Sequence, residues 1–422
     1  MSTMRGSVHD YQLDSNGRRV STMRGVDLYQ YTYDAVGRLQ TVTDPSGSTI
    51  SYTYDAVGNR LNETVGKKTK VCEYDADNRL VESHMVQLPG GYPIHWWAWE
   101  YDNNGNQAAQ TIINGTTGPY YTYDYENRLA NVRLNPDNPG DTNVSYAYLP
   151  DGDRMSRTNA TETVFYLCDR GNVIAVLDAA GNPIETFLHG KGVDEPVAMK
   201  SGGLVFGYVQ DGLGSTVSLV DVLGQSVPVS YVYDAWGNLE ACYGDQTMNN
   251  PYLFTGREYD WQTGVYYYRA RSYDANLGRF LQRDPTGMAD GPNMYAYCGN
   301  DPVNNKDPGG MTMMNEPGIH ELPWNEVEAL RRERMIKYCT QSCAYLAQCS
   351  RLPNEYSNKV DHCTKDDVQY ILFDSNNLVY QVHKPSYRLC YIDCYYGSIF
   401  RSLFRQINYN RRPHVGPAWA HT

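Results

Sequence analysis

Two aspartates at tight turns are the residues in this chain whose type and spacing could do chemistry. They open two Asp-Pro-x-Gly units, Asp284–Gly287 and Asp307–Gly310, with 19 residues between them. In such a unit proline fixes φ at the second position and aspartate bonds back to the turn backbone, so each unit predicts a type I turn. Two turn aspartates need do no more than cap their turns. If the fold brings the carboxylates together, however, they could share one proton and act as acid and base.

A second set of reactive side chains follows residue 311, where six of the ten cysteines lie. They are Cys339, Cys343, Cys349, Cys363, Cys390 and Cys394. Two Cys-x-x-x-Cys pairs have i, i+4 spacing, which places each pair on one face of a helix. We expect helices near 325–346 and 389–407, with a hairpin at 370–382 between them. Disulfides, a zinc site and free buried thiols all remain open, and disulfides are favoured because zinc sites more often use Cys-x-x-Cys.

The same C-terminal stretch contains candidate bases but no nucleophile motif. Its histidines are His362, His383 and His414. Arginines alternate with aromatic residues between 401 and 412, as on RNA-binding surfaces, although a solvated basic helix end would look the same. The sequence therefore names no activity for this stretch and leaves nucleic acid open as its partner.

The elements that must position the turn aspartates are short repeats rich in tyrosine. The marker Asp-x-x-Gly or Asp-x-x-Asn recurs with spacings of 20, 21, 20, 27 and 22 residues and often follows Tyr-x-Tyr. The repeat aspartates are Asp14, Asp34, Asp55, Asp75, Asp102, Asp124 and Asp234. Tyr-x-Tyr has the alternation of a strand with both rings on one face, and the aspartate begins a turn in which Asn78 and Asn127 replace glycine. Because one hairpin is marginal alone, we predict a long antiparallel sheet built from neighbouring hairpins.

Composition and charge narrow the class of protein. The chain has 38 tyrosines against eight phenylalanines among 422 residues. Residues 1–310 hold 23 basic and 37 acidic residues, which argues against nucleic acid as the partner of this part. We find neither a basic-then-apolar signal sequence nor an apolar run near the roughly 20 residues that span a bilayer.

The block from 251 to 311 resembles the core of the Rhs family of YD-repeat proteins. The matching motifs are Thr255–Asp260 (TGREYD), Tyr267–Asp274 (YYRARSYD), Gly278–Pro285 (GRFLQRDP) and Tyr295–Gly310. The resemblance covers about residues 11–311. It implies a mainly β fold in which antiparallel YD hairpins curl into a shell-like sheet, as in teneurin-like proteins. The chain begins inside a repeat, so we expect a shortened or fragmentary Rhs protein.

The resemblance also implies an intramolecular aspartic protease that cuts once, just after the final Asp-Pro-x-Gly. Carried over by position, the carboxylates are Asp284 and Asp307, and Arg283 would lower the pKa of one of them. The cut would fall at Gly310 and Met311, where methionine replaces the leucine usual in the family. Asp290 and Asp301 are the runner-up acids of the same block.

Three domains follow from these observations: repeats at 1–250, the core at 251–311, and a small Cys-rich α+β domain at 312–422. In Rhs proteins the last position is variable and commonly a toxin, which would be the cargo of the shell. The resemblance then implies a secreted or cell-surface bacterial protein, an immunity protein and a secretion apparatus as partners, and no cofactor or metal. The alternative is a structural or adhesive surface protein whose disulfide-bonded tail has no catalytic role.

Overall fold

The computed structural model describes residues 9–87, 90, 93–112, 117–134, 143–221, 226–315, 369–373 and 379–383. The chain divides into two compact units, residues 1–178 with 183–321, and residues 322–422 with 179–182. In the second unit, strands β29 (Gln369–Phe373) and β30 (Val379–His383) pair antiparallel, in the range where the sequence predicts a hairpin. The two helices expected on either side of it lie outside the described residues.

The first unit is mainly β, as predicted, and contains one antiparallel sheet of 22 strands in which each strand pairs with the next. The strands are β1 (His9–Leu13), β2 (Arg19–Arg24), β3 (Asp27–Tyr33), β4 (Leu39–Thr43), β5 (Thr49–Tyr54), β6 (Arg60–Val65), β7 (Lys68–Tyr74), β8 (Leu80–Gln87), β9 (Pro93–Tyr101), β10 (Gln107–Ile112), β11 (Thr117–Tyr123), β12 (Leu129–Arg133), β13 (Asn143–Tyr148), β14 (Arg154–Thr158), β15 (Thr163–Asp169), β16 (Asn172–Leu177), β17 (Pro183–His189), β18 (Pro196–Ser201), β19 (Leu204–Gln210), β20 (Thr216–Asp221), β21 (Val229–Tyr233) and β22 (Leu239–Gly244).

Each repeat aspartate opens the turn that the sequence predicts. In the turn after β3, the Gly37 N–H donates to the Asp34 carbonyl at 3.1 Å. One carboxylate oxygen of Asp34 accepts the N–H groups of Val36 and Arg38 at 3.0 and 2.9 Å. Asn78 and Asn127 have φ of 62°, so the left-handed conformation expected where they replace glycine is confirmed. These local bonds explain why so short a sequence marker is enough to reverse the chain.

In four of the seven repeat turns an arginine four residues after the aspartate links the turn to the next repeat, and the other three turns have asparagine there. The Arg38 Nε donates to Asp34 Oδ2 at 2.6 Å, and the guanidinium lies 4.7 Å from the ring centre of Tyr54. The Tyr54 hydroxyl in turn donates to the Leu39 carbonyl at 2.7 Å. Tyrosine suits this position because its ring packs and stacks while its hydroxyl bonds the backbone of the preceding repeat.

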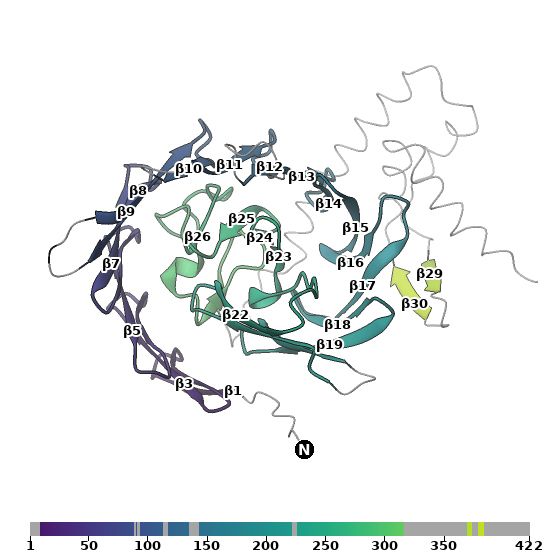
Figure 1. Cartoon of the computed structure of the whole chain (residues 1–422), viewed down its shortest axis with the longest axis horizontal. Helices are drawn as coiled ribbons and strands as arrows, with labels where there is room; N and C mark the ends of the chain where they lie inside the picture. Colours follow the sequence, from purple (N-terminus) through teal and green to yellow (C-terminus); the bar gives the residue numbers. More distant parts are fainter. Residues whose placement is uncertain are drawn as a thin grey trace, which may run out of the picture. The chain divides into compact units, whose positions relative to one another are not determined.

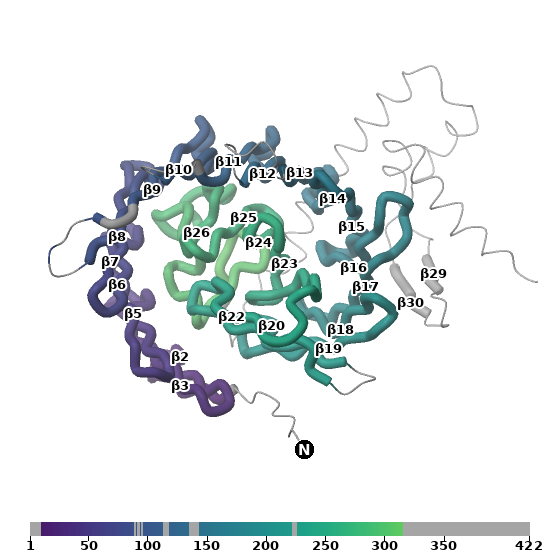
Figure 2. The backbone as a smooth tube through the Cα atoms, in the orientation of Figure 1, coloured from purple at the N-terminus to yellow at the C-terminus, as the bar shows by residue number. Residues whose placement is uncertain are grey.

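The block after β22 forms a second, smaller sheet inside the first unit. Its strands are β23 (Glu258–Asp260), β24 (Val265–Tyr268), β25 (Arg271–Asp274) and β26 (Arg279–Phe280), and β27 (Asn305–Lys306) pairs separately with β28 (Met314–Asn315). Two 3-10 turns, η1 (Phe254–Gly256) and η2 (Cys298–Asn300), connect these strands. In Figures 1 and 2 the strands of the long sheet curve around β23–β26. None of the helices described is long and apolar enough to cross a membrane.

The small sheet is tied to the long sheet by buried aromatic rings and by hydrogen bonds. The rings of Tyr268, Tyr273 and Tyr297 lie in one buried cluster with Tyr231 and Tyr233 of β21. The Gln107 N–H donates to the Leu281 carbonyl at 2.9 Å, the Tyr295 hydroxyl to the Gly105 carbonyl at 2.7 Å, and the Arg60 guanidinium to the Leu277 carbonyl at 2.7 Å. The repeat turns therefore fix the position of the block that carries the two Asp-Pro units.

Candidate functional site

Both Asp-Pro-x-Gly units form the turns that the sequence predicts. The Gly287 N–H donates to the Asp284 carbonyl at 3.0 Å, and the Gly310 N–H donates to the Asp307 carbonyl at 3.3 Å. The second turn lies inside the short hairpin of β27 and β28, whose register pairs Lys306 with Met314. The chain on both sides of Met311 is therefore held by pairing.

One arginine joins the two carboxylates. The Arg271 Nη2 atom lies 2.9 Å from Asp284 Oδ2 and 3.2 Å from Asp307 Oδ2. All three side chains are at most 4 % exposed, so the ion pairs are shielded from water. Arg271 belongs to β25, and its guanidinium stacks on the Phe280 ring at 3.6 Å from the ring centre. The two aspartates that the sequence singles out are thus brought into one buried site.

The predicted cleavage segment lies directly against this site. Asp307 Oδ1 accepts the N–H groups of Met311 and Thr312 at 3.0 and 3.1 Å. The Arg271 Nε donates to the Gly310 carbonyl at 2.6 Å. The nitrogens of both peptide bonds that flank Met311 therefore contact a carboxylate, and the carbonyl of the first bond is polarised by a cation.

Burial sets the protonation of the site. Desolvation raises the pKa of the Asp307 carboxyl, and the charge of Asp284 adds to this, although Arg271 and the two amides oppose it. Burial likewise raises the pKa of Asp290, whose carboxylate accepts the Met313 N–H at 2.7 Å. Like charges so close together favour a shared proton in the site.

The other site residues predicted from the sequence, Asp290, Asp301 and Arg283, differ in whether they contact the cleavage segment. Asp290 contacts the same segment, as just described. Asp301 instead accepts a hydrogen bond from Asn304 at 2.7 Å, and burial raises its pKa to about 6. Arg283 directs its guanidinium to the Met294 sulfur at 3.6 Å, so the arginine that joins the two carboxylates is Arg271. Arg271 lies on β25, whose four residues are all buried, and no local sequence pattern marks it as the arginine of the site.

The predictions of disulfides and of a possible zinc site concern cysteines that lie outside the residues that the structure describes. The six cysteines proposed for disulfides, from Cys339 to Cys394, lie outside the described residues. Of the described cysteines, Cys72, Cys242 and Cys298 are free thiols. Within the described ranges no cluster of three or more His, Cys, Asp or Glu side chains could hold a metal ion.

Comparison with known proteins places the fold in a family. The model of the teneurin YD-shell family matches residues 8–303. The tRNA nuclease WapA of Bacillus subtilis strain 168 is 31% identical over 290 residues, which cover 66% of this chain and 12% of WapA. The double-stranded DNA deaminase toxin A of Burkholderia cenocepacia is 26% identical over 359 residues, 73% of this chain and 25% of the toxin.

A solved structure is similar at lower identity. The crystal structure of TcdB2-TccC3-TEV superimposes with a TM-score of 0.49 at 18% identity, over 72% of this chain and 18% of that one. This chain thus spans a small part of the length of the proteins that it matches. The family model nevertheless covers the repeats and almost all of the core block, in agreement with the resemblance seen in the sequence. The chain therefore belongs to the teneurin YD-shell family, as a YD-repeat region of the Rhs type.

Proposed function

We propose that this YD shell hydrolyses its own backbone at one of the two peptide bonds that flank Met311, with Asp284 and Asp307 as the catalytic pair. The observation that supports this most strongly is that Asp284 and Asp307 share the Arg271 Nη2 atom, while the Nε of the same arginine donates to the Gly310 carbonyl. A carboxylate that only capped its turn would not need a second carboxylate on the same guanidinium nitrogen. The reaction would occur once in each molecule.

The two carboxylates divide the chemistry. Asp307, whose pKa is raised by burial, supplies the proton, because it lies against the amide nitrogens. Asp284, held by Arg271, takes a proton from the attacking water. The water oxygen bonds to the carbonyl carbon, the C–N bond breaks, and the leaving nitrogen receives the proton from Asp307.

Cleavage would cut the covalent link between the shell and its cargo, the C-terminal piece that begins at Met311 or Thr312. Two relatives that share the repeat region are named as a tRNA nuclease and as a DNA deaminase toxin, which favours an effector acting on other cells. We propose a secreted or surface-exposed bacterial protein with a cognate immunity protein and a secretion apparatus as partners. The nature of the effector activity is left open by the sequence.

A structural role at a cell surface is the second candidate. The salivary gland surface protein 1 of Aedes aegypti is 40% identical over 85 residues, or 20% of this chain and 2% of that protein. Under this proposal the turn aspartates would only cap their turns, and the chain would remain whole. A growth assay separates the two roles: bacteria that produce the whole chain should grow more slowly than bacteria that produce it without residues 312–422. Equal growth would contradict the toxin proposal.

Substitution of each aspartate tests the catalytic pair. Asp284→Asn and Asp307→Asn should each leave the chain whole while preserving the turn, because one acid cannot be base and proton donor at the same moment. Asp44→Asn is a matched control, since Asp44 opens an exposed Asp-Pro-Ser-Gly turn and its carboxylate accepts the N–H groups of Ser46 and Ser48. Mass measurement under denaturing conditions reads the result. Cleavage that survives both core substitutions would point to a host protease instead.

A further inference from the structure

The turn between β24 and β25 is bonded to the second Asp-Pro-x-Gly turn. Residues 269–271 donate hydrogen bonds to the carbonyl groups of residues 308–310. In the turn between β24 and β25, the Arg269 guanidinium donates to the Pro308 carbonyl, and the Ala270 N–H donates to the Gly309 carbonyl at 3.2 Å. The next residue, Arg271, donates to the Gly310 carbonyl at 2.6 Å. A Cβ atom at Gly310 would overlap the Tyr268 carbonyl oxygen, so the two turns approach as closely as glycine allows. The second Asp-Pro turn is therefore held in place along its whole backbone.

Arg269 is strained in this position. Its φ is 57°, and it is the first central residue of a two-residue hairpin whose strands pair Tyr268 with Arg271. Glycine is the residue preferred at such a position. A residue with a side chain is strained there, and contacts with the rest of the fold must offset the free-energy cost of that strain. The offset lies in the guanidinium, because the side chain is buried and both of its Nη atoms donate hydrogen bonds to other elements of the fold.

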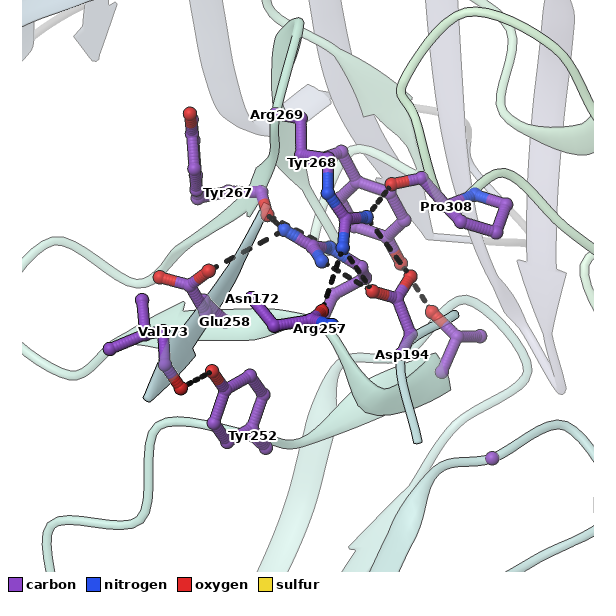
Figure 3. Close-up of polar contacts among 12 residues, drawn as sticks. Asn172, Val173, Asp194, Tyr252, Arg257, Glu258, Tyr267, Tyr268, Arg269 and Pro308 are labelled. Atoms are coloured by element: carbon purple, nitrogen blue, oxygen red, sulfur yellow. Dashed lines mark hydrogen bonds and ion pairs between the residues drawn. The ribbon is translucent and has the colours of Figure 1, made fainter. Parts of the chain in front are cut away.

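The group that holds Arg269 belongs to the long repeat sheet. Asp194, in the loop between β17 and β18, accepts from Arg269 Nη2 at 2.7 Å and from Arg257 Nη1 at 2.6 Å (Figure 3). Its side chain is 1 % exposed. Gly256 lies so near that a Cβ atom there would overlap the Asp194 carbonyl. Asp194 thus forms ion pairs with two buried arginines of the core block from a loop of the repeats.

We propose that Asp194 is a positioning residue for self-cleavage: it holds Arg269 against the Pro308 carbonyl and so fixes Asp307 and the bonds beside Met311. The inference rests on the proposed function and extends it to regulation. Because Asp194 lies on the repeat sheet, the cleavage site is complete only after the β17–β18 loop has docked on the core block. Cleavage would then be coupled to assembly of the sheet around this block.

Two substitutions test the coupling through the rate of cleavage. Arg269→Gly removes the guanidinium but suits the backbone conformation, so the fold should be kept while cleavage slows at least about 10-fold. Asp194→Asn should slow it similarly, and Arg269→Lys should fall between Arg269→Gly and the unaltered chain because lysine cannot bind both partners. Arg170→Gly is the matched control, since Arg170 is an exposed arginine with φ of 52° in the β15–β16 turn. Normal cleavage in both Arg269→Gly and Asp194→Asn would overturn the proposal.

A second measurement does not depend on cleavage. In the Asp284→Asn background, which leaves the contacts of Asp307 in place, amide hydrogen exchange over residues 307–312 reports how firmly the turn is held. Arg269→Gly should speed this exchange, and Arg170→Gly should leave it unchanged. If the unaltered chain did not cleave, the proposed function would fail, and this comparison would still decide the positioning role. Equal exchange with and without Arg269→Gly would contradict it.

Discussion

At the scale of single residues, the site depends on an arginine that bonds to both acids and to the chain that they would cut. The Arg271 Nη2 atom contacts both Asp284 and Asp307, and its Nε donates to the Gly310 carbonyl. A planar guanidinium can do this because its donors are fixed in a fork. In the proposed cleavage, Arg271 would stabilise the negative charge that develops on the Gly310 carbonyl oxygen.

Replacing Arg271 by lysine should reveal this role. Lysine keeps the positive charge but cannot hold two carboxylates and a carbonyl together, so Arg271→Lys should slow self-cleavage at least about 10-fold. Time-resolved mass measurement of the refolding chain gives the rate. Arg283→Lys, measured beside it, compares the arginine named by the sequence with the one found at the site. A larger effect at Arg283 than at Arg271 would contradict this account.

The site shows which contacts sequence could predict and which it could not. The turns at Asp284 and Asp307 follow from residues next to each other, so the sequence predicted them. The contact of Arg271 with Asp307 joins residues 36 positions apart, and that of Arg269 with Asp194 spans 75 positions. Such pairs depend on how the small sheet packs within the long one. No local pattern could therefore single out Arg271 or Asp194.

At the scale of elements, the repeat is a unit that couples to its neighbour. The sequence predicted its strands and turn, because alternation and turn residues act locally. It did not predict that the arginine after the turn contacts the turn aspartate, the tyrosine ring of the next repeat and a backbone carbonyl, as Arg38 does. The pKa of the Asp34 carboxyl is lowered by the backbone and guanidinium of Arg38, against the effect of partial burial. Its contribution to stability is thus present above its ordinary pKa and is lost as the pH falls below it.

A comparison of two turns measures what the arginine contributes. Asp34→Ala removes both backbone caps and the Arg38 contact, whereas Asp44→Ala removes caps of the same kind from a turn that has Ser48 in place of arginine. We expect Asp34→Ala to lower the free energy of unfolding by about 1 kcal/mol more than Asp44→Ala at pH 7. Urea unfolding at pH 7 provides both values. Equal losses would mean that the arginine contact adds nothing.

At the scale of the whole molecule, several buried carboxyl groups bind protons more tightly in the folded chain than in the unfolded chain. Desolvation raises the pKa of Asp234 and of Glu185 to about 7, and that of Asp301 to about 6. A carboxyl whose pKa is higher in the folded chain favours folding fully below its unfolded pKa, and this contribution is lost as the pH rises through the folded value. These three groups therefore predict weaker folding toward neutral and alkaline pH.

Unfolding at two pH values tests this prediction. The free energy of unfolding should fall by about 2 kcal/mol between pH 5 and pH 8, and Asp234→Asn should reduce that fall because asparagine does not titrate. Urea titrations monitored by tryptophan fluorescence give both values. A free energy that rises over the same interval would show that other groups dominate.

The measurement that tests self-cleavage most directly is the mass of the chain after cell-free synthesis in water labelled with oxygen-18. The account predicts two pieces under denaturing conditions, with the N-terminal piece ending at Gly310 or Met311 and carrying one labelled oxygen in its new carboxyl group. The label is expected because the attacking water supplies that oxygen. The pieces should stay together in native buffer, since β27 and β28 pair across the cut. A single species of 47.8 kDa would contradict the central claim.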